Sequence, residues 1–240
     1  RPLSRPPEEV WAEARRVVAS GCAEVVITGV HLGLYGRDGA CSLGELVRRL
    51  GEIEGLRRIR FGSLEPFALS EGLLEELRGV AAFCPHLHIP LQSGDDGVLR
   101  RMRRGYVASD FSRQVEALRR AFGDEVHVST DLLVGFPGET EEAFRRTLDL
   151  VTQLGLGRLH VFPYSPRPGT AAALWTDRPS REEARRRCRE ADALGKELLG
   201  RYAARFVGQE VDLLVEEGSE EAVQGLSPHF LRVRGEGPGD

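Results

Sequence analysis

The sequence has 240 residues, of which 41% are hydrophobic and 29% are charged, and its formal net charge is −4. This composition is typical of a globular protein and excludes an intrinsically disordered chain. The length allows one large domain, or one domain with a small appendage. No apolar run is long enough to cross a bilayer. A slightly negative chain has no overall attraction for nucleic acid, so any such contact requires a local basic patch.

The four cysteines are scattered, at positions 22, 41, 84 and 188. No two of them have the spacing of metal ligands or of a redox pair. We therefore expect each to be a small buried residue in a reducing, cytoplasmic compartment. The sequence contains no signal peptide, and it begins with Arg1 rather than Met, which leaves open that a preceding segment is missing.

Helices and strands alternate through the first two thirds of the chain. Apolar spacing and capping residues predict helices over residues 8–20, 42–54, 70–81, 109–122 and 140–155, and a short helix after the turn at 92–97. Short apolar runs predict strands at 24–28, 58–62, 86–90, 125–134 and 158–162. This order predicts an α/β fold in which right-handed crossovers join parallel strands, either as a barrel or as an open sheet. Because a helix comes first, the pattern leaves room for a missing first strand.

The pattern changes after Phe162. A Pro- and Gly-rich loop over 163–170 precedes a predicted helix over 180–206, which carries eight basic and five acidic residues. Such a helix is either an exposed face with many salt bridges or a contact for an anionic polymer. Short strands predicted at 210–215 and 230–233 indicate the start of a small β-barrel that is cut short at Asp240.

Polar or small residues recur at or near the ends of the predicted strands. They are Thr28 and Gly29, Ser63 and Glu65, Gln92 and Ser93, Thr130 and Asp131, and Tyr164 and Ser165. In a parallel sheet these positions converge on one rim, where a carboxylate such as Glu65 could accept hydrogen bonds from ribose hydroxyls. Small residues at Gly29 and Gly135 would let the backbone approach an adenine or an amino-acid group.

The segment from His86 to Tyr106 is the most distinctive part of the sequence. It joins a buried strand, a polar turn and a helix with four arginines, Arg100, Arg101, Arg103 and Arg104. Guanidinium groups suit a carboxylate, a phosphate or a nucleic-acid backbone, because they offer planar paired donors. The alternative is an exposed charged helix face without function.

Five phrases, in this order, carry a family resemblance: ITGVHLGLYGRDG, SLEP, HLHIPLQSGDDGVLRRMRRGY, STDLLVGFPGETEEAF and LHVFPYSPRPGTAA. Together they resemble the radical SAM tRNA methylthiotransferases over residues 1 to about 235. The wording of HLHIP and LHVFPYS is most similar to the branch that acts on threonylcarbamoyladenosine. The isopentenyladenosine branch shares the same scaffold.

The resemblance implies a partial (β/α) TIM-like radical SAM barrel over 1–178, a basic linking helix over 179–206, and the start of a small TRAM-like β domain over 207–240. It implies that a 4Fe–4S cluster splits S-adenosylmethionine (SAM), and that the resulting radical removes hydrogen from C2 of an adenine in tRNA. A second cluster then supplies sulfur, and a methylthio group is installed. The implied partners are tRNA and an electron donor, with no membrane.

The resemblance also assigns residues. Thr28 and Gly29 are expected at the methionine end of SAM, and Ser63 and Glu65 at its ribose. Gln92, Ser93 and Asp131 are expected to line the pocket, with Val134 and Gly135 by the adenine. The RNA contacts are expected at Arg100, Arg101, Arg103, Arg104, Arg185 and Arg189. No catalytic residue is assigned.

The family's C-x-x-x-C-x-x-C cluster motif is absent from this sequence, and the four cysteines do not have its spacing. We therefore expect this chain to be an inactive piece of a longer enzyme, with no metal ligand of its own. One alternative is a cluster-free RNA-binding module. Another is a barrel enzyme that acts on a phosphorylated metabolite.

Overall fold

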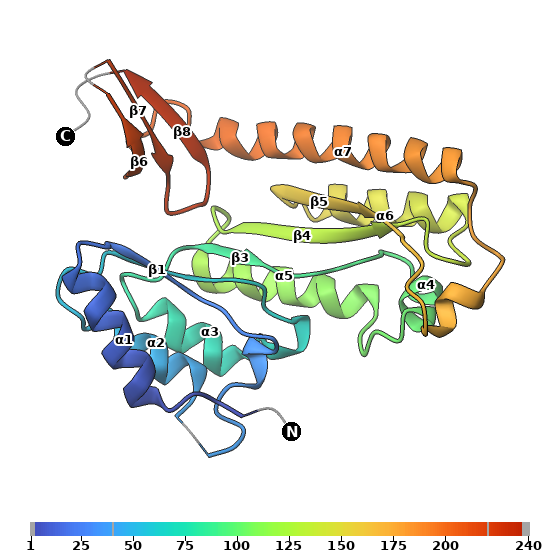
Figure 1. The fold of residues 1–240 in the computed structure, drawn as a ribbon. Helices are drawn as coiled ribbons and strands as arrows, with labels where there is room; N and C mark the ends of the chain where they lie inside the picture. The colour runs from blue at the N-terminus through green and yellow to red at the C-terminus, as the bar shows by residue number, and fades with distance from the viewer. Residues whose placement is uncertain (1–2, 40, 220, 237–240) are drawn as a thin grey trace. The chain divides into compact units, whose positions relative to one another are not determined.

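The computed structural model describes residues 3–39, 41–219 and 221–236. Its helices are α1 (Pro7–Ala19), α2 (Leu43–Gly51), α3 (Glu71–Arg78), α4 (Asp96–Arg101), α5 (Ala108–Phe122), α6 (Glu141–Gln153) and α7 (Arg181–Ala203). Its strands are β1 (Glu24–Ile27), β2 (Arg58–Phe61), β3 (His86–His88), β4 (His127–Val134), β5 (Arg158–Pro163), β6 (Leu214–Gly218), β7 (Ala222–Leu226) and β8 (Arg232–Glu236). Figure 1 shows this order along the chain.

The chain divides into two compact units. Unit 1 consists of the described residues within Arg1–His88, Ala117–His127 and Phe206–Asp240, and unit 2 consists of Ile89–Glu116 and Val128–Arg205. Unit 1 is therefore built from three separate stretches of sequence.

Unit 1 contains a short parallel sheet. β1 pairs with β2 from Glu24↔Arg58 to Ile27↔Phe61, and parallel bridges at Ile59↔Phe83 and Ser63↔His88 place the next stretch of chain beside β2. All four residues of β2 are buried. Helices α2 and α3 contact each other and bury Leu50 and Leu77. The carboxyl ends of β1 and β2 thus lie side by side, as the alternating pattern predicts.

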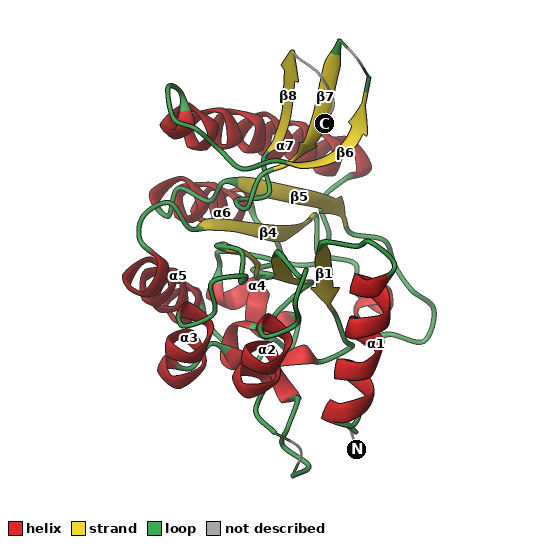
Figure 2. Cartoon of the chain, turned by 90° about the vertical axis from the view of Figure 1, so that its left-hand side faces the viewer, coloured by secondary structure: helices red, strands yellow, loops and turns green. Residues whose placement is uncertain are grey.

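Unit 1 also contains the antiparallel sheet β6–β7–β8, which Figure 2 shows as three adjacent strands. The turn between β7 and β8 carries Phe230, whose φ is +59°. The predicted strand at 210–215 begins later than expected, as β6. Strand β7 was not predicted, because its small and polar residues do not alternate clearly with apolar ones. Residues 237–240 of the predicted C-terminal domain, and Ala40 of the predicted loop after β1, lie outside the described residues.

Unit 2 is built around β4 and β5, which pair in parallel from Ser129↔Arg158 to Val134↔Pro163. The segment before α4 joins the other edge of β4, since Ile89 N donates to Ser129 O at 2.9 Å and Gln92 N donates to Asp131 O at 2.8 Å. Helix α7 packs along β5, as Figure 1 shows.

The predicted helix starts are confirmed by their caps. The side chains of Ser42, Thr140 and Ser180 accept hydrogen bonds from the backbone N–H groups of Glu45, Ala143 and Glu183, at 2.9, 3.2 and 3.1 Å. Each bond satisfies a donor that the first helical turn would otherwise leave unpaired.

The mixed α/β fold with parallel strand pairs agrees with the sequence prediction, and the described strands form partial sheets rather than a closed barrel. One expectation is wrong, because only Cys84 of the four cysteines is buried. Cys22 is exposed in the turn between α1 and β1, and Cys41 and Cys188 are partly buried. β4 ends at Val134 as predicted, so Thr130 and Asp131 lie within the strand. No helix among the described residues is long and apolar enough to cross a membrane.

Candidate functional site

The candidate site residues fall into two groups, one in each unit. Thr28, Gly29, Ser63 and Glu65 belong to unit 1, whereas Gln92, Ser93, Asp131, Val134 and Gly135 belong to unit 2. The predicted meeting of Glu65, Gln92 and Asp131 around one cavity involves both units, so it stays a prediction.

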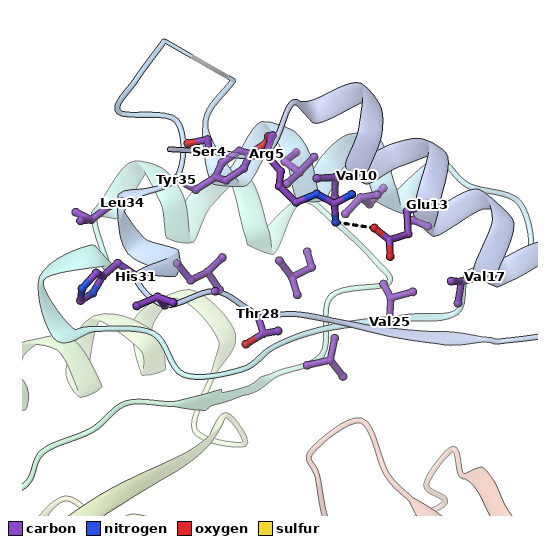
Figure 3. A pocket seen from close by; sticks show the side chains of 18 of the residues that line it. Ser4, Arg5, Val10, Glu13, Val17, Val25, Thr28, His31, Leu34 and Tyr35 are labelled. Carbon is purple, nitrogen blue, oxygen red and sulfur yellow. Dashed lines mark hydrogen bonds and ion pairs between the residues drawn. The ribbon is translucent and has the colours of Figure 1, made fainter. Parts of the chain in front are cut away.

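In unit 1, Thr28 and Gly29 follow β1 directly and line a cavity of about 900 Å³. Its walls come from α1, β1 and the loop after β1 (Figure 3). The lining is largely apolar, and the ion pair of Arg5 with Glu13, at 2.6 Å, lies beside it. Nothing approaches closer than 3.8 Å to a Cβ placed on Gly29, so the backbone there is open to a ligand.

Glu65 connects the loop after β2 to the loop after β1. Its Oε1 lies 2.8 Å from Nδ1 of His31, and its Oε2 accepts from Gly33 N at 3.3 Å. Because a carboxylate has about four lone-pair directions, these two contacts leave Glu65 able to accept from a further hydroxyl. A side chain at position 33 would collide with Ala68, since a Cβ there would lie 2.2 Å from Cβ of Ala68. The two loops are therefore closely fitted around this carboxylate.

Ser63 is fixed in the same unit by its neighbours. It forms a parallel bridge with His88, and the next residue, Leu64, donates its N–H to His88 O at 3.0 Å. Gly62 precedes it where a Cβ would lie 3.0 Å from Oγ1 of Thr28, so this position accepts little more than glycine. Thr28 and Ser63 consequently lie at neighbouring strand ends.

In unit 2, Gln92 has a left-handed backbone, with φ of +69°. Both of its backbone groups bond to β4, because its N–H donates to Asp131 O and its carbonyl accepts from Leu133 N at 2.9 Å. A non-glycine residue in this conformation costs about 1–3 kcal/mol and is found disproportionately at functional sites. The strain supports the sequence interpretation of Gln92 as a site residue.

Ser93 is placed differently from Gln92. Its side chain is 1% exposed, and its hydroxyl accepts from Asp95 N at 3.2 Å and lies 3.4 Å from Oγ1 of Thr147. Gly94 also donates to Thr147, at 2.9 Å. Ser93 therefore ties the turn before α4 to α6.

The turn at Gly135–Gly138 follows β4, and its backbone is held by a buried carboxylate. Gly135 N donates to Glu139 Oε2 at 2.7 Å, and Arg187 of α7 donates to the same oxygen at 2.9 Å and to Glu139 O at 3.0 Å. Burial raises the pKa of Glu139, while Gly135 and Arg187 oppose the rise. Val134 thus ends β4, and Gly135 begins a turn that hydrogen bonds with Glu139 hold in place.

Arg187 is one of the basic residues that the sequence interpretation assigned to an exposed helix. It is instead 1% exposed and is also bonded to Glu141 and Glu183. Neither Glu139 nor Arg187 was singled out from the sequence. The only signal in the sequence was that each of these two charged residues lies in a segment that also carries apolar residues.

The predicted RNA-contacting arginines lie on the surface of unit 2. Arg100, Arg101, Arg103 and Arg104 are exposed on and just after α4, and Arg185 and Arg189 are exposed on α7. Arg101 differs from the others because its guanidinium pairs with Asp177 at 3.0 Å and stacks on Trp175.

Two buried arginines of unit 1 were also missed. Arg60 is 1% exposed, and it donates to Glu24 Oε1 at 2.9 Å, Pro228 O at 2.8 Å and Ser227 O at 2.7 Å. Arg58 donates to Leu226 O at 2.6 Å and to Asp212 O at 3.0 Å. Through these bonds Arg60 attaches β2 to the turn between β7 and β8, and Arg58 attaches it to the end of β7 and to the segment before β6.

Open backbone and polar side chains at the carboxyl ends of parallel strands are the arrangement with which partial α/β barrels bind cofactors. This arrangement defines the protein as a cofactor-binding α/β protein with a partial barrel. Within that class, the chain belongs to the radical SAM superfamily, whose family model matches residues 1–151.

Similar proteins extend this assignment. The threonylcarbamoyladenosine tRNA methylthiotransferase of Thermotoga maritima is 38% identical over 213 residues, which cover 89% of this chain and 49% of that protein. The tRNA-2-methylthio-N(6)-dimethylallyladenosine synthase of Thermobifida fusca is 40% identical over 216 residues, covering 89% and 44%. The chain spans about half the length of the curated relatives that it matches.

Among solved structures, coproporphyrinogen III oxidase of Escherichia coli, a radical SAM enzyme, superposes with a TM-score of 0.59 at 19% identity, covering 80% of this chain and 46% of that one. Methylornithine synthase superposes with a TM-score of 0.52 at 20% identity, covering 71% and 47%. These likenesses establish the partial TIM-like fold.

The radical SAM superfamily uses SAM and a 4Fe–4S cluster. The described residues contain no group of three or more His, Cys, Asp or Glu side chains that could hold a metal ion. Cys84 is buried, with its pKa raised to about 11 by burial, whereas Cys22 is exposed. The residues that the structure describes therefore do not fit the cluster.

Proposed function

We propose that this chain is the SAM- and tRNA-binding part of an enzyme that adds a methylthio group to C2 of N6-threonylcarbamoyladenosine, next to the anticodon of tRNA. The observation that carries the proposal is the similarity of about nine tenths of the chain to enzymes named as tRNA methylthiotransferases. The threonylcarbamoyladenosine substrate is the finer part of the proposal. It is supported by the HLHIP and LHVFPYS segments.

In this proposal each residue group contacts a part of SAM. Thr28 and Gly29 receive the methionine end on the open backbone after β1, and Ser63 and Glu65 receive the ribose. Gln92, Ser93 and Asp131 line the pocket, Ser93 through the turn that it fixes. Val134 and Gly135 lie by the adenine, on the turn held by Glu139. The strained backbone of Gln92 supports a binding role, because such strain persists only where the surroundings impose it.

The proposed RNA surface consists of exposed arginines on and just after α4 (Arg100, Arg103 and Arg104) and on α7 (Arg185 and Arg189). Arg101, which the sequence resemblance also assigns to this surface, is engaged with Asp177 and Trp175. Arginines contact phosphates through paired donors, and each phosphate contact makes binding weaker at higher salt. We also propose that residues 1–178 form the core, that 179–206 form the linking helix, and that 207–240 begin a small RNA-gripping β domain. An electron donor for the cluster completes the proposed partners.

The test is anaerobic iron–sulfur reconstitution of the product of the complete reading frame, followed by mass spectrometry of nucleosides from treated tRNA. We expect the 2-methylthio derivative of threonylcarbamoyladenosine. The corresponding derivative of dimethylallyladenosine would overturn the proposed substrate but retain the reaction. If no methylthio nucleoside forms although the 4Fe–4S cluster that splits SAM is intact, the proposed reaction is wrong.

A second test uses this chain alone, by electrophoretic shift with tRNA at several salt concentrations. Binding that weakens steadily as salt rises supports the arginine surface. If tRNA does not shift at low ionic strength, the proposed RNA contacts are wrong.

A further inference from the structure

The Gly135–Gly138 turn is also contacted by an arginine of α4. Gly138 has φ of +85°, and a Cβ placed on it would lie 2.8 Å from Nε of Arg101. The backbone N–H of Gly138 donates to Asp177 O at 2.7 Å. The side chain of Arg101 in turn donates to the carboxylate of Asp177 at 3.0 Å. Arg101, Gly138 and Asp177 therefore form one closed set of contacts.

Trp175 completes this set. The guanidinium of Arg101 lies 4.5 Å from the centre of the Trp175 ring, and that ring is perpendicular to the ring of Phe136 in the turn, at a centroid distance of 6.0 Å. Phe136 also packs edge-on against Tyr164, at 5.1 Å. The stacked cation thus connects the segment around Trp175 to the turn, because a guanidinium over an aromatic face is attracted by the electrons of the ring.

We propose that Arg101 is a positioning residue for the Gly135–Gly138 turn rather than a contact for RNA. The exposed side chains of Arg100, Arg103 and Arg104 are proposed to contact an anionic partner. Arg101 instead uses its planar donors to pair with Asp177 and its face to stack on Trp175, both within unit 2. These contacts fix the backbone of the turn beside which the adenine of SAM is proposed to lie. The part of this inference that concerns the adenine rests on the proposed function. The contacts of Arg101 with Gly138, Asp177 and Trp175, which we call the clamp, do not depend on it.

Arg101→Met and Arg101→Lys separate the two roles. Lysine keeps the positive charge that RNA would require but lacks the planar guanidinium that pairs with Asp177 while stacking on Trp175. The matched control is Arg100→Met, which removes the same charge from the preceding exposed position. Asp177→Asn perturbs the clamp from its other side.

The first measurement uses this chain in a Trp11→Phe background, so that Trp175 is the only tryptophan. We expect both Arg101 variants to shift Trp175 emission to longer wavelength and to raise amide exchange at Gly138 by about tenfold. Asp177→Asn should raise that exchange in the same direction, and Arg100→Met should change neither signal. If Gly138 exchange and Trp175 emission stay at parental values in both Arg101 variants, the positioning role is wrong.

The second measurement compares the two ligands in the reconstituted product of the complete reading frame. We expect Arg101→Met and Arg101→Lys to raise the KM for SAM several-fold and to leave the affinity for tRNA within twofold. Arg100→Met should do the reverse and reduce the salt dependence of tRNA binding by about one phosphate contact. A tRNA affinity that falls in Arg101→Met and returns in Arg101→Lys would make Arg101 an RNA contact and overturn the inference. A parent protein that binds no tRNA would contradict the proposed function alone, because the Trp175 and Gly138 signals would still decide the clamp.

Discussion

Replacing Arg60 with methionine tests whether the buried arginines stabilise unit 1. The substitution removes three hydrogen bonds, to Glu24 Oε1, Pro228 O and Ser227 O, and leaves Glu24 with only Arg58, 4.0 Å from its other oxygen. Losing one partner of a buried ion pair costs about 3–5 kcal/mol, because the remaining charge stays desolvated. Methionine still fills space beside Phe230, so we expect a loss of about 3–5 kcal/mol in the free energy of unfolding rather than more.

The assay is urea unfolding of the whole chain in a Trp175→Phe background. The fluorescence of Trp11, which lies in unit 1, monitors the unfolding, and the free energy is extrapolated linearly to water. Arg57→Met is the matched control, because Arg57 is exposed and precedes Arg58; it should change stability by no more than about 0.5 kcal/mol. Adding Glu24→Leu to Arg60→Met should recover at least about 1 kcal/mol, since it removes the unpaired carboxylate. A loss below about 1 kcal/mol for Arg60→Met alone would refute this reasoning.

Three further predictions concern single residues. Gln92→Gly should raise stability by about 0.5–1 kcal/mol, because glycine adopts φ of +69° without strain, while it weakens SAM binding; thermal unfolding and SAM titration check both, and a destabilised variant would contradict it. At pH 8, Ellman's reagent should modify exposed Cys22 quickly and Cys84 slowly, because a pKa of about 11 leaves about one thiolate in a thousand; peptide mapping would reveal a fast reaction at Cys84, which would be the wrong outcome. Burial raises the pKa of Glu139, so its contribution to stability is largest below the ordinary pKa of a glutamate and declines as pH rises through the raised value. The stability of the parent minus that of Glu139→Gln should therefore decrease between pH 4 and pH 7, and a difference that grows with pH would count against the shift.

The elements that sequence patterns predict well are those whose cause is local. The caps at Ser42, Thr140 and Ser180 bond to groups three residues away, so the helix starts follow from the sequence alone. The parallel pairing of β1 with β2, and of β4 with β5, follows from the alternation of strands and helices.

The features that the sequence did not predict depend on distant partners. The carbonyls that accept hydrogen bonds from Arg58 and Arg60 lie more than 150 residues further along the chain. In the same way, nothing near Arg187 indicates that it will be buried against Glu139, 48 residues earlier. The left-handed backbone of Gln92 is imposed by its bonds to β4, and no property of glutamine predicts it.

The attachment of Ser227 and Pro228 to β2 has a consequence for synthesis. A ribosome delivers Arg60 long before it delivers the two carbonyls that Arg60 requires, so in the nascent amino-terminal strands Arg60 has Glu24 as a partner but lacks two of its three hydrogen bonds. Domains rich in such long-range contacts fold slowly, and their incomplete forms expose surfaces that aggregate. We therefore expect translation that stops before Ser227 to yield a product that chaperones and proteases recognise, even though most of its helices and strands have already been made.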